Sequence, residues 1–140
     1  MAQKINNTQV APGPFIGVIP GSTLSTTGNK AITGVGFKPK LVRFTVMPTS
    51  NAAISLSSGS TVFGNGAAVS STSQYAVMVS TQSPGTGLVR TSTTNRCFGF
   101  VTGSNVYNLS ASLVQMDDNG FTINVLNESP AFDVAYEAYP

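Results

Sequence analysis

Histidine and tryptophan are absent from this sequence, and cysteine occurs once, at Cys97. Without histidine, acid–base chemistry near neutral pH has no default side chain, and a serine or cysteine nucleophile has no imidazole base. No Ser-x-x-Lys motif offers a lysine as a substitute base. One cysteine allows neither an internal disulfide nor a paired-cysteine redox or metal motif. We therefore expect that the protein is not an enzyme.

Acidic residues are also few, and all five lie within residues 117–137. Asp117 and Asp118 are adjacent in a turn signal, so their side chains diverge and do not form the facing carboxylates of a glycosidase. The run Asp117–Gly120 lacks the alternating acids and the distal glutamate of an EF-hand. No glycine-rich phosphate loop is followed by a helical pattern. We expect no cofactor and no metal site.

Charge is scarce overall, at 9% of residues, against about 25% in an average soluble domain. All seven basic residues lie between Lys4 and Arg96, and the only cluster is Lys38, Lys40 and Arg43. A nucleic-acid-binding protein usually shows a denser basic patch, so we expect no nucleic-acid partner. The separation of basic and acidic residues suggests that the two parts meet, within the fold or between subunits.

Long apolar runs are missing as well. No basic stretch precedes a short apolar segment, and no run of about 18 apolar residues occurs, so we expect neither a signal peptide nor a membrane helix.

The residues that are present favour an all-β fold. Serine, threonine and asparagine are abundant and favour strands and turns over helices, and 14 glycines and eight prolines interrupt the chain. Alternating apolar and polar residues between turn signals predict about eight short strands. These strands are expected at residues 31–35, 41–47, 53–57, 74–81, 96–102, 106–116, 121–125 and 132–138.

The remaining segments are expected to be turns and loops. Residues 59–73, with a short strand at 61–63, and residues 82–94 are expected to be long loops. Asn119-Gly120 is typical of a type I′ hairpin turn. The expected fold is a single antiparallel β-sandwich or a jelly roll, two alternatives that give nearly the same strand pattern.

Residues 1–29 differ from the β-sandwich domain that we expect at residues 30–140. Proline and glycine punctuate two apolar pairs, Phe15-Ile16 and Val18-Ile19. This pattern predicts an extended N-terminal arm whose apolar anchors lie on the body of the same chain or on a neighbouring subunit.

Exposed tyrosines could stack on sugars. The candidates are Tyr75, Tyr107, Tyr136 and Tyr139, and Tyr75 is the best of them because it begins a strand beside a long loop. Filling of a core or an interface is the simpler interpretation of Tyr75.

Three segments together are similar to a known class of proteins. Gly34–Val42, which contains Gly-Phe-Lys-Pro-Lys, Asp118–Val125 and Val134–Tyr139 resemble, in this order, parts of small β-sandwich virion proteins of tailed phages. The resemblance covers residues 30–140. The usual hairpin of that class has Asp-Gly directly, whereas Asn119 intervenes here.

This resemblance implies a bacteriophage virion protein, of which two kinds are expected. The first is a capsid decoration (cement) protein on the capsid surface, made in the host cytoplasm, whose partners are the major capsid protein and copies of itself in a homotrimer. The alternative is a receptor-binding or lectin-like tail-fibre module that binds host surface glycan with the loops at 59–73 and 82–94. The 29-residue arm is short for a fibre shaft, which favours the decoration role.

An assembly interface is the functional site that we expect. Its apolar part is the arm, and its charged part pairs the basic cluster with acidic residues near the C-terminus. If the arm carries the interface, deletion of residues 1–25 should abolish assembly, and if charges join subunits, salt should weaken assembly. The expected interface residues are Phe15, Ile16, Val18, Ile19, Lys38, Lys40, Arg43, Asp133 and Glu137.

Overall fold

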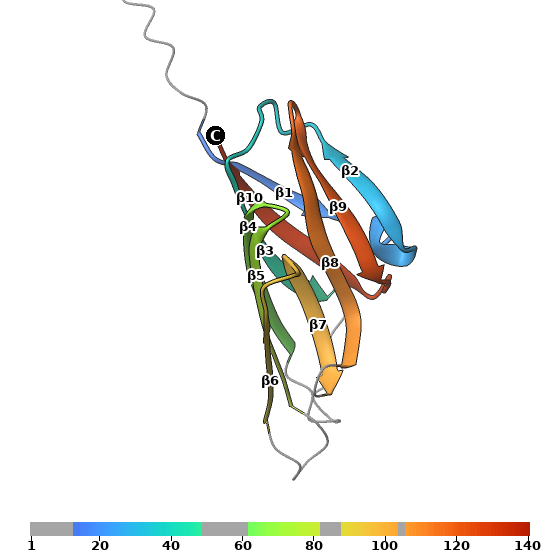
Figure 1. Ribbon diagram of the computed structural model, residues 1–140. Coiled ribbons are helices and arrows are strands. Elements are labelled where there is room, and N and C mark those ends of the chain that lie inside the picture. Colours follow the sequence, from blue (N-terminus) through green and yellow to red (C-terminus); the bar gives the residue numbers. More distant parts are fainter. Residues whose placement is uncertain (1–12, 49–61, 82–87, 104–105) are drawn as a thin grey trace, which may run out of the picture.

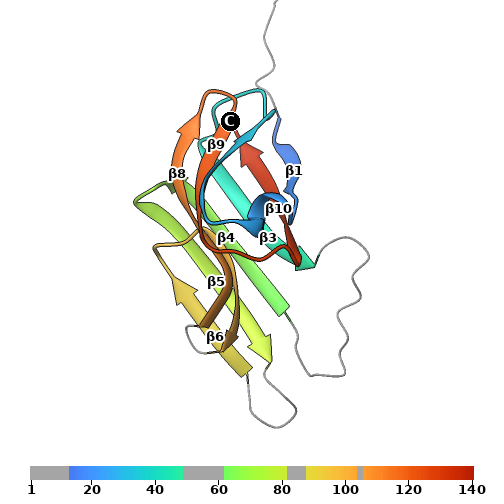
Figure 2. The same ribbon diagram turned by 90° about the vertical axis from the view of Figure 1, so that its right-hand side faces the viewer.

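The computed structural model describes residues 13–48, 62–81, 88–103 and 106–140. These ranges contain ten strands and one short 3₁₀ helix (Figures 1 and 2). The elements are β1 (Phe15–Ile19), η1 (Thr23–Ser25), β2 (Gly28–Thr33), β3 (Leu41–Pro48), β4 (Val62–Ser70), β5 (Ser73–Thr81), β6 (Leu88–Thr93), β7 (Phe98–Gly103), β8 (Val106–Asp117), β9 (Gly120–Asn127) and β10 (Phe132–Tyr139).

The strands form two antiparallel sheets, which pack as the two layers of a sandwich (Figure 1). One sheet has six strands in the order β1-β10-β3-β4-β5-β6, and the other has four in the order β2-β9-β8-β7. The predicted all-β sandwich is therefore confirmed, with ten strands described where about eight were expected.

The pairing combines nested outer strands with two meanders. β1 pairs with β10 and β2 pairs with β9, so the first two strands lie beside the last two. β3 to β6 and β7 to β9 are joined in sequence as antiparallel neighbours.

The core between the sheets follows the alternation of the sequence. On β3, Phe44 is buried between its own sheet and the other, whereas Arg43 and Thr45 are exposed. The Phe44 ring lies 5.2 Å from the ring of Phe98 and 5.7 Å from that of Phe121, centroid to centroid. Tilted and edge-on pairs of this kind each add about 0.5–1.5 kcal/mol beyond the burial of apolar area.

The expected hairpin joins β8 to β9, but its centre is shifted by one residue. Asp117 pairs with Gly120, so Asp118 and Asn119 are the two turn residues. Gly120 has a φ of +151°, and a Cβ atom there would overlap the carbonyl oxygen of Ile32. Glycine at this position therefore serves both the left-handed backbone and the close approach of β2.

Part of the expected N-terminal arm lies in the sandwich. Strand β1 pairs with β10 from Phe15 opposite Ala138 to Ile19 opposite Val134. Ile19 and Leu24 are buried in the core. The expected boundary at residue 29 falls inside β2, which begins at Gly28.

Two segments expected to be loops contain strands instead. The segment 59–73, expected to be a loop with a short strand at 61–63, contains all of β4. In β4 the backbones of Gly64 and Gly66 lie so close to the carbonyl oxygens of Gly99 and Cys97 that no room is left for a Cβ atom. These glycines are interior strand positions and not turn signals. The segment 82–94 contains β6, which pairs with β5 along its length. The strand expected at 53–57 lies outside the described residues.

Candidate interaction surface

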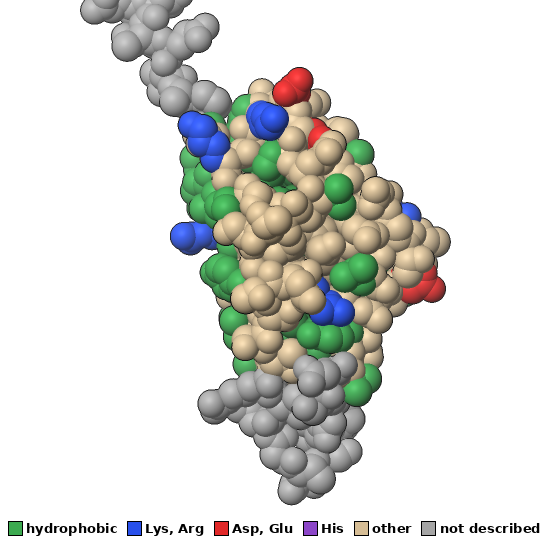
Figure 3. All heavy atoms as spheres, viewed as in Figure 1, with side chains coloured by type: hydrophobic (Ala, Val, Ile, Leu, Met, Phe, Trp, Pro, Cys, Tyr) green, Lys and Arg blue, Asp and Glu red, His purple; other side chains and the backbone are tan. Residues whose placement is uncertain are grey.

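The side of the six-stranded sheet that points away from the other layer, called here the outer face, is rich in exposed apolar side chains. Eight large apolar side chains are exposed among the described residues, and Val106 and Leu126 are the two that lie on the four-stranded sheet. In Figure 3 hydrophobic side chains follow the left-hand edge of the molecule, where the six-stranded sheet lies. The six on the outer face are Ile16, Val18, Phe63, Val69, Tyr75 and Val77.

Strand register arranges the outer face in rows, because side chains of opposed residues stand side by side across the sheet. The first row runs from β1 to β5 through Ile16, Glu137, Arg43, Ala67 and Tyr75. The second row runs through Val18, Ala135, Thr45, Asn65 and Val77. The second row therefore contains no ionisable group, and the first contains two adjacent residues of opposite charge.

Those two residues, Arg43 and Glu137, are members of the expected charged interface. They are opposed in the register of β3 and β10, yet no ion pair within 4.0 Å joins them. The carboxylate of Glu137 accepts a hydrogen bond from the Tyr139 hydroxyl, and Arg43 lies 5.8 Å from the centre of the Tyr139 ring. That hydrogen bond raises the pKa of Tyr139, and the positive charge of Arg43 opposes the increase.

The other expected charged residues do not belong to this pair. Lys38 and Lys40 are exposed in the segment between β2 and β3. Asp133 is half-buried, and its Oδ1 accepts a 2.8 Å hydrogen bond from the backbone N–H of Gly21. Asp133 thus holds the segment that follows β1 in place, and its carboxylate already has a hydrogen-bond partner within the fold.

The expected arm residues alternate between two environments. Ile16 and Val18 are 73% and 52% exposed on the outer face, whereas Ile19 is buried. Phe15 points inward, with its ring 6.1 Å from that of Tyr136. Deletion of residues 1–25 would remove core residues together with exposed ones, so that deletion does not isolate an interface.

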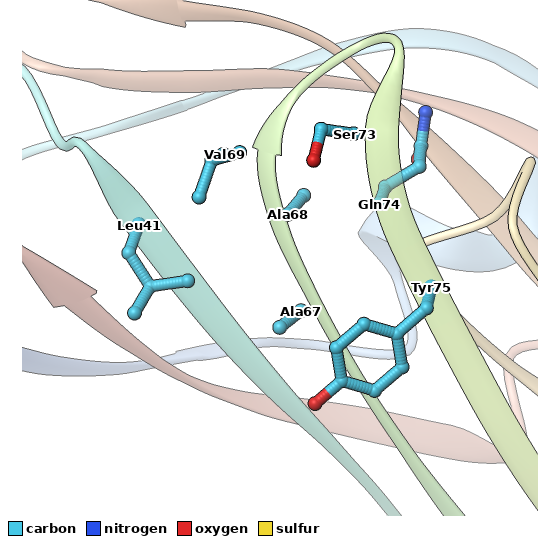
Figure 4. Close-up of a pocket in the computed structure, with 7 residues that line it drawn as sticks. All are labelled: Leu41, Ala67, Ala68, Val69, Ser73, Gln74 and Tyr75. Carbon is cyan, nitrogen blue, oxygen red and sulfur yellow. The ribbon is translucent and has the colours of Figure 1, made fainter.

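Tyr75 is half-exposed, with a hollow on each side. The first hollow, shown in Figure 4, lies against the β4–β5 turn. It is lined by Leu41, Ala67, Ala68, Val69, Ser73, Gln74 and Tyr75. The second hollow extends from Tyr75 and Val77 to Ser92, Thr93, Thr94 and Asn95, and it has no charged lining residue. The side chain of Tyr75 is therefore accessible, unlike that of Tyr136, which is buried.

The outer face of the four-stranded sheet has a different character. Its rows join Asn29, Asn124 and Ser112, and Ala31, Thr122 and Gln115. These side chains are polar apart from Ala31, and none is charged. The sandwich is thus two-sided, with an apolar outer face on one sheet and a largely polar outer face on the other.

A polar cluster stands at one edge of that second sheet. The guanidinium of Arg96 lies 4.0 Å from the centre of the Tyr107 ring, and its Nε donates a 3.1 Å hydrogen bond to the Ser110 hydroxyl. Ser110 in turn donates to Asn127 Oδ1 at 2.6 Å. These contacts satisfy the buried hydroxyl of Ser110, so we interpret the cluster as structural.

Cys97 is a core residue. It is fully buried, its Sγ lies 3.4 Å from the Ala111 carbonyl oxygen, and burial raises the pKa of the thiol. A protonated thiol without solvent access is a poor nucleophile. Among the residues that the structure describes, no three His, Cys, Asp or Glu side chains lie close enough to hold a metal ion, and no helix has the length and apolar character needed to cross a membrane.

Sequence reasoning missed the β4 part of the outer face. Val69 lies in a segment expected to be a loop, and Phe63 ends the short strand expected at 61–63, although Phe63, Asn65 and Ala67 alternate with inward residues. The inward residues include Gly64 and Gly66. The sequence signal for this strand was the alternation in Phe63-Gly64-Asn65-Gly66-Ala67, in which every second residue is a glycine.

Comparisons with protein-family models, curated protein sequences and solved structures found no match to this chain. The likeness of its three motifs to tailed-phage virion proteins therefore stays a prediction.

Proposed function

We propose that this chain is a non-enzymatic bacteriophage virion protein, specifically a capsid decoration protein that stabilises the head by binding across capsomers. The apolar outer face of the six-stranded sheet is the observation that carries this proposal. Its partners are the major capsid protein and further copies of the chain, on the capsid surface, after synthesis in the host cytoplasm.

The composition of the outer face fits contact with protein. The cores of protein–protein interfaces are depleted in charged residues and enriched in aromatic ones. Exposed apolar patches on a folded domain commonly mark such contacts. Val18, Val77 and Tyr75 are each more than 40% exposed, and burial of such side chains gains roughly 25 cal/mol per Å² of apolar area.

Scarcity of charge supports the same role. Arg43 and Glu137 stand next to one another, so their opposite charges offset each other, and the row through Val18 and Val77 has no charge to desolvate. Repeated over many copies on a symmetric shell, modest contacts of this kind add up to strong attachment.

Co-sedimentation with heads that lack the protein tests the proposal. The purified chain should pellet with such heads in saturable amounts. Val77→Asp, which adds a carboxylate to the outer face, should reduce binding at least tenfold. Ala31→Asp adds the same group to an exposed position on the polar face and should leave binding unchanged. Lack of binding by the wild-type chain, or equal loss with both variants, would contradict the proposal.

A second candidate function is a receptor-binding or lectin-like tail module. The hollow between Tyr75 and Asn95 favours it, because an accessible aromatic ring beside neutral hydroxyl and amide groups is suited to an uncharged sugar. Under this function the chain should bind host surface glycan, and Tyr75→Ala should abolish that binding while head binding in the assay above is absent.

A further inference from the structure

The strands β1, β10, β3 and β4 carry a self-complementary part of the outer face. In the first row, Arg43 and Glu137 are neighbours on β3 and β10. On their flanks stand Ile16 of β1 and Ala67 of β4. An apolar residue, an acid, a base and an apolar residue therefore follow one another across four strands.

A two-fold axis parallel to the strands, placed between β3 and β10 in the plane of contact, makes this row complementary to itself. Rotation about that axis lays β10 of one copy over β3 of the other, and β1 over β4. Arg43 then faces Glu137 of the second copy, and Glu137 faces Arg43. This is the isologous contact typical of homodimers, in which every interaction occurs twice.

The apolar residues of the same strands also meet. Ile16 and Val18 of β1 are exposed, and so are Phe63 and Val69 of β4. With β1 over β4, Ile16 faces Ala67 and Val18 faces Asn65 of the second copy, and Phe63 and Val69 lie at the next outward positions along β4. Tyr75 and Val77 on β5 lie beyond the overlap and stay accessible to another partner.

Pairing of two sheets through the edge of β1 is disfavoured by the sequence. Pro14 and Pro20 bracket this five-residue strand, and proline has no backbone N–H to donate to a neighbouring strand. Short, proline-flanked edge strands are a common protection against edge-to-edge pairing. At β1, two copies are therefore expected to associate through the outer face of the sheet and not by pairing strand edges.

We propose that the β1–β10–β3–β4 part of the outer face binds a second copy of this chain, with reciprocal Arg43–Glu137 contacts at its centre. This inference deepens the proposed function, because it rests on the outer face as a protein-binding surface. It assigns one part of that face to a two-fold dimer, in place of the homotrimer that the resemblance implies, and leaves β5 for the other partner.

Charge-reversal variants of the full chain test this pairing. Arg43→Glu puts carboxylates at both positions of the pair, and Glu137→Arg puts guanidinium groups at both. In sedimentation-equilibrium runs each variant alone should dissociate at least tenfold more readily than the wild-type chain. An equimolar mixture should associate, because every contact in the mixed dimer joins opposite charges. Asp118→Lys, a reversal at an exposed turn residue of the other sheet, is the control and should associate like the wild-type chain.

The mixing experiment shows whether Arg43 and Glu137 interact between two copies or only within one copy. Repulsion within a chain would weaken each variant, but mixing could not relieve it. A wild-type chain that stays monomeric at millimolar concentration, or variants whose mixture does not associate although circular dichroism shows them folded, would overturn the inference. A monomer that still pellets with heads would refute the self-association alone, whereas a dimer that fails to pellet would refute the decoration function alone.

Discussion

Gly66 of β4 lies directly beneath the carbonyl oxygen of Cys97, so closely that a Cβ atom at residue 66 would overlap that oxygen. The backbone of the six-stranded sheet here approaches the segment that leads into β7 of the other sheet. Gly64, two residues earlier, is in the same position relative to the Gly99 carbonyl oxygen. The two layers of the sandwich are therefore held at backbone contact along this part of β4.

Gly66→Ala should destabilise the fold, because the added methyl group has to push the two backbones apart. Overpacking of this kind typically costs about 1–3 kcal/mol, and we expect a loss of roughly 3 kcal/mol because the obstacle is backbone. Urea denaturation measures the free energy of unfolding. Gly13→Ala is the matched control, since a Cβ atom at that position meets nothing within 4 Å. Equal stability of the two variants would show that the close approach is wrong.

Phe44→Ala should lower the free energy of unfolding by about 3–5 kcal/mol, because it opens a cavity between Phe98 and Phe121. Phe63→Ala removes the same side chain from the outer face, where it is 47% exposed, and should cost less than about 1 kcal/mol. Thermal or chemical denaturation of both variants makes the comparison. A larger loss for Phe63→Ala would mean that the faces of the six-stranded sheet are assigned the wrong way round.

Stability should fall as the pH rises above about 8.5, the ordinary pKa of a thiol. Burial raises the pKa of Cys97 in the folded state, so the unfolded chain loses this proton first and is favoured by alkali. Each pH unit costs up to about 1.4 kcal/mol from this group. Burial also raises the pKa of Tyr136, which extends the decline beyond pH 10.

Cys97→Ala isolates the thiol contribution. The free energy of unfolding of this variant should change less between pH 8 and about pH 10 than that of the wild-type chain. Parallel pH profiles for the two proteins would show that the thiol titrates alike in the folded and unfolded states, contrary to its burial.

Arg96 and Tyr107 should be energetically coupled, because the guanidinium lies 4.0 Å from the ring centre. A double-mutant cycle with Arg96→Ala and Tyr107→Leu should give a coupling of about 1 kcal/mol, within the range for a partly desolvated cation–π contact. The pair Arg43 and Tyr139, at 5.8 Å, serves as the comparison and should give about half of that or less. Coupling that is absent in the first pair would contradict the stacked geometry.

Much of the fold follows from the sequence because exposure alternates along single strands. The strands predicted at 41–47, 106–116, 121–125 and 132–138 are present with small changes at their ends. In these segments the buried apolar residues alternate with more exposed ones, so burial and local pattern agree. The hairpin at Asp118-Asn119 was also recognisable, because short polar residues followed by a glycine favour a turn.

The parts that the sequence did not reveal depend on contacts between distant segments. Gly64 and Gly66 suggest a loop by themselves, and only the position of Cys97 in the other sheet explains them as strand residues. Likewise, residues 15–19 become a strand because β10, near the other end of the sequence, provides an edge for them to pair with. The candidate surface was the part least visible in the sequence, because Val69 lies in a segment assigned to a loop and Phe63 ends a strand expected to stop at residue 63.

The residues of the expected charged interface lie in different surroundings in the fold. Arg43 and Glu137 do stand together, because the antiparallel register of β3 and β10 opposes them. Asp133 instead holds the backbone of Gly21, a contact between β10 and the turn after β1. Residue type alone did not distinguish these two roles, whereas register and burial do.

The copy number of this chain in purified virions tests the central claim most directly. Quantitative mass spectrometry can measure its molar ratio to the major capsid protein in the same particles. We predict a number comparable to that of the major capsid protein, as binding across capsomers requires. A number equal to a small multiple of the tail symmetry, or absence from the particles, would contradict the decoration function.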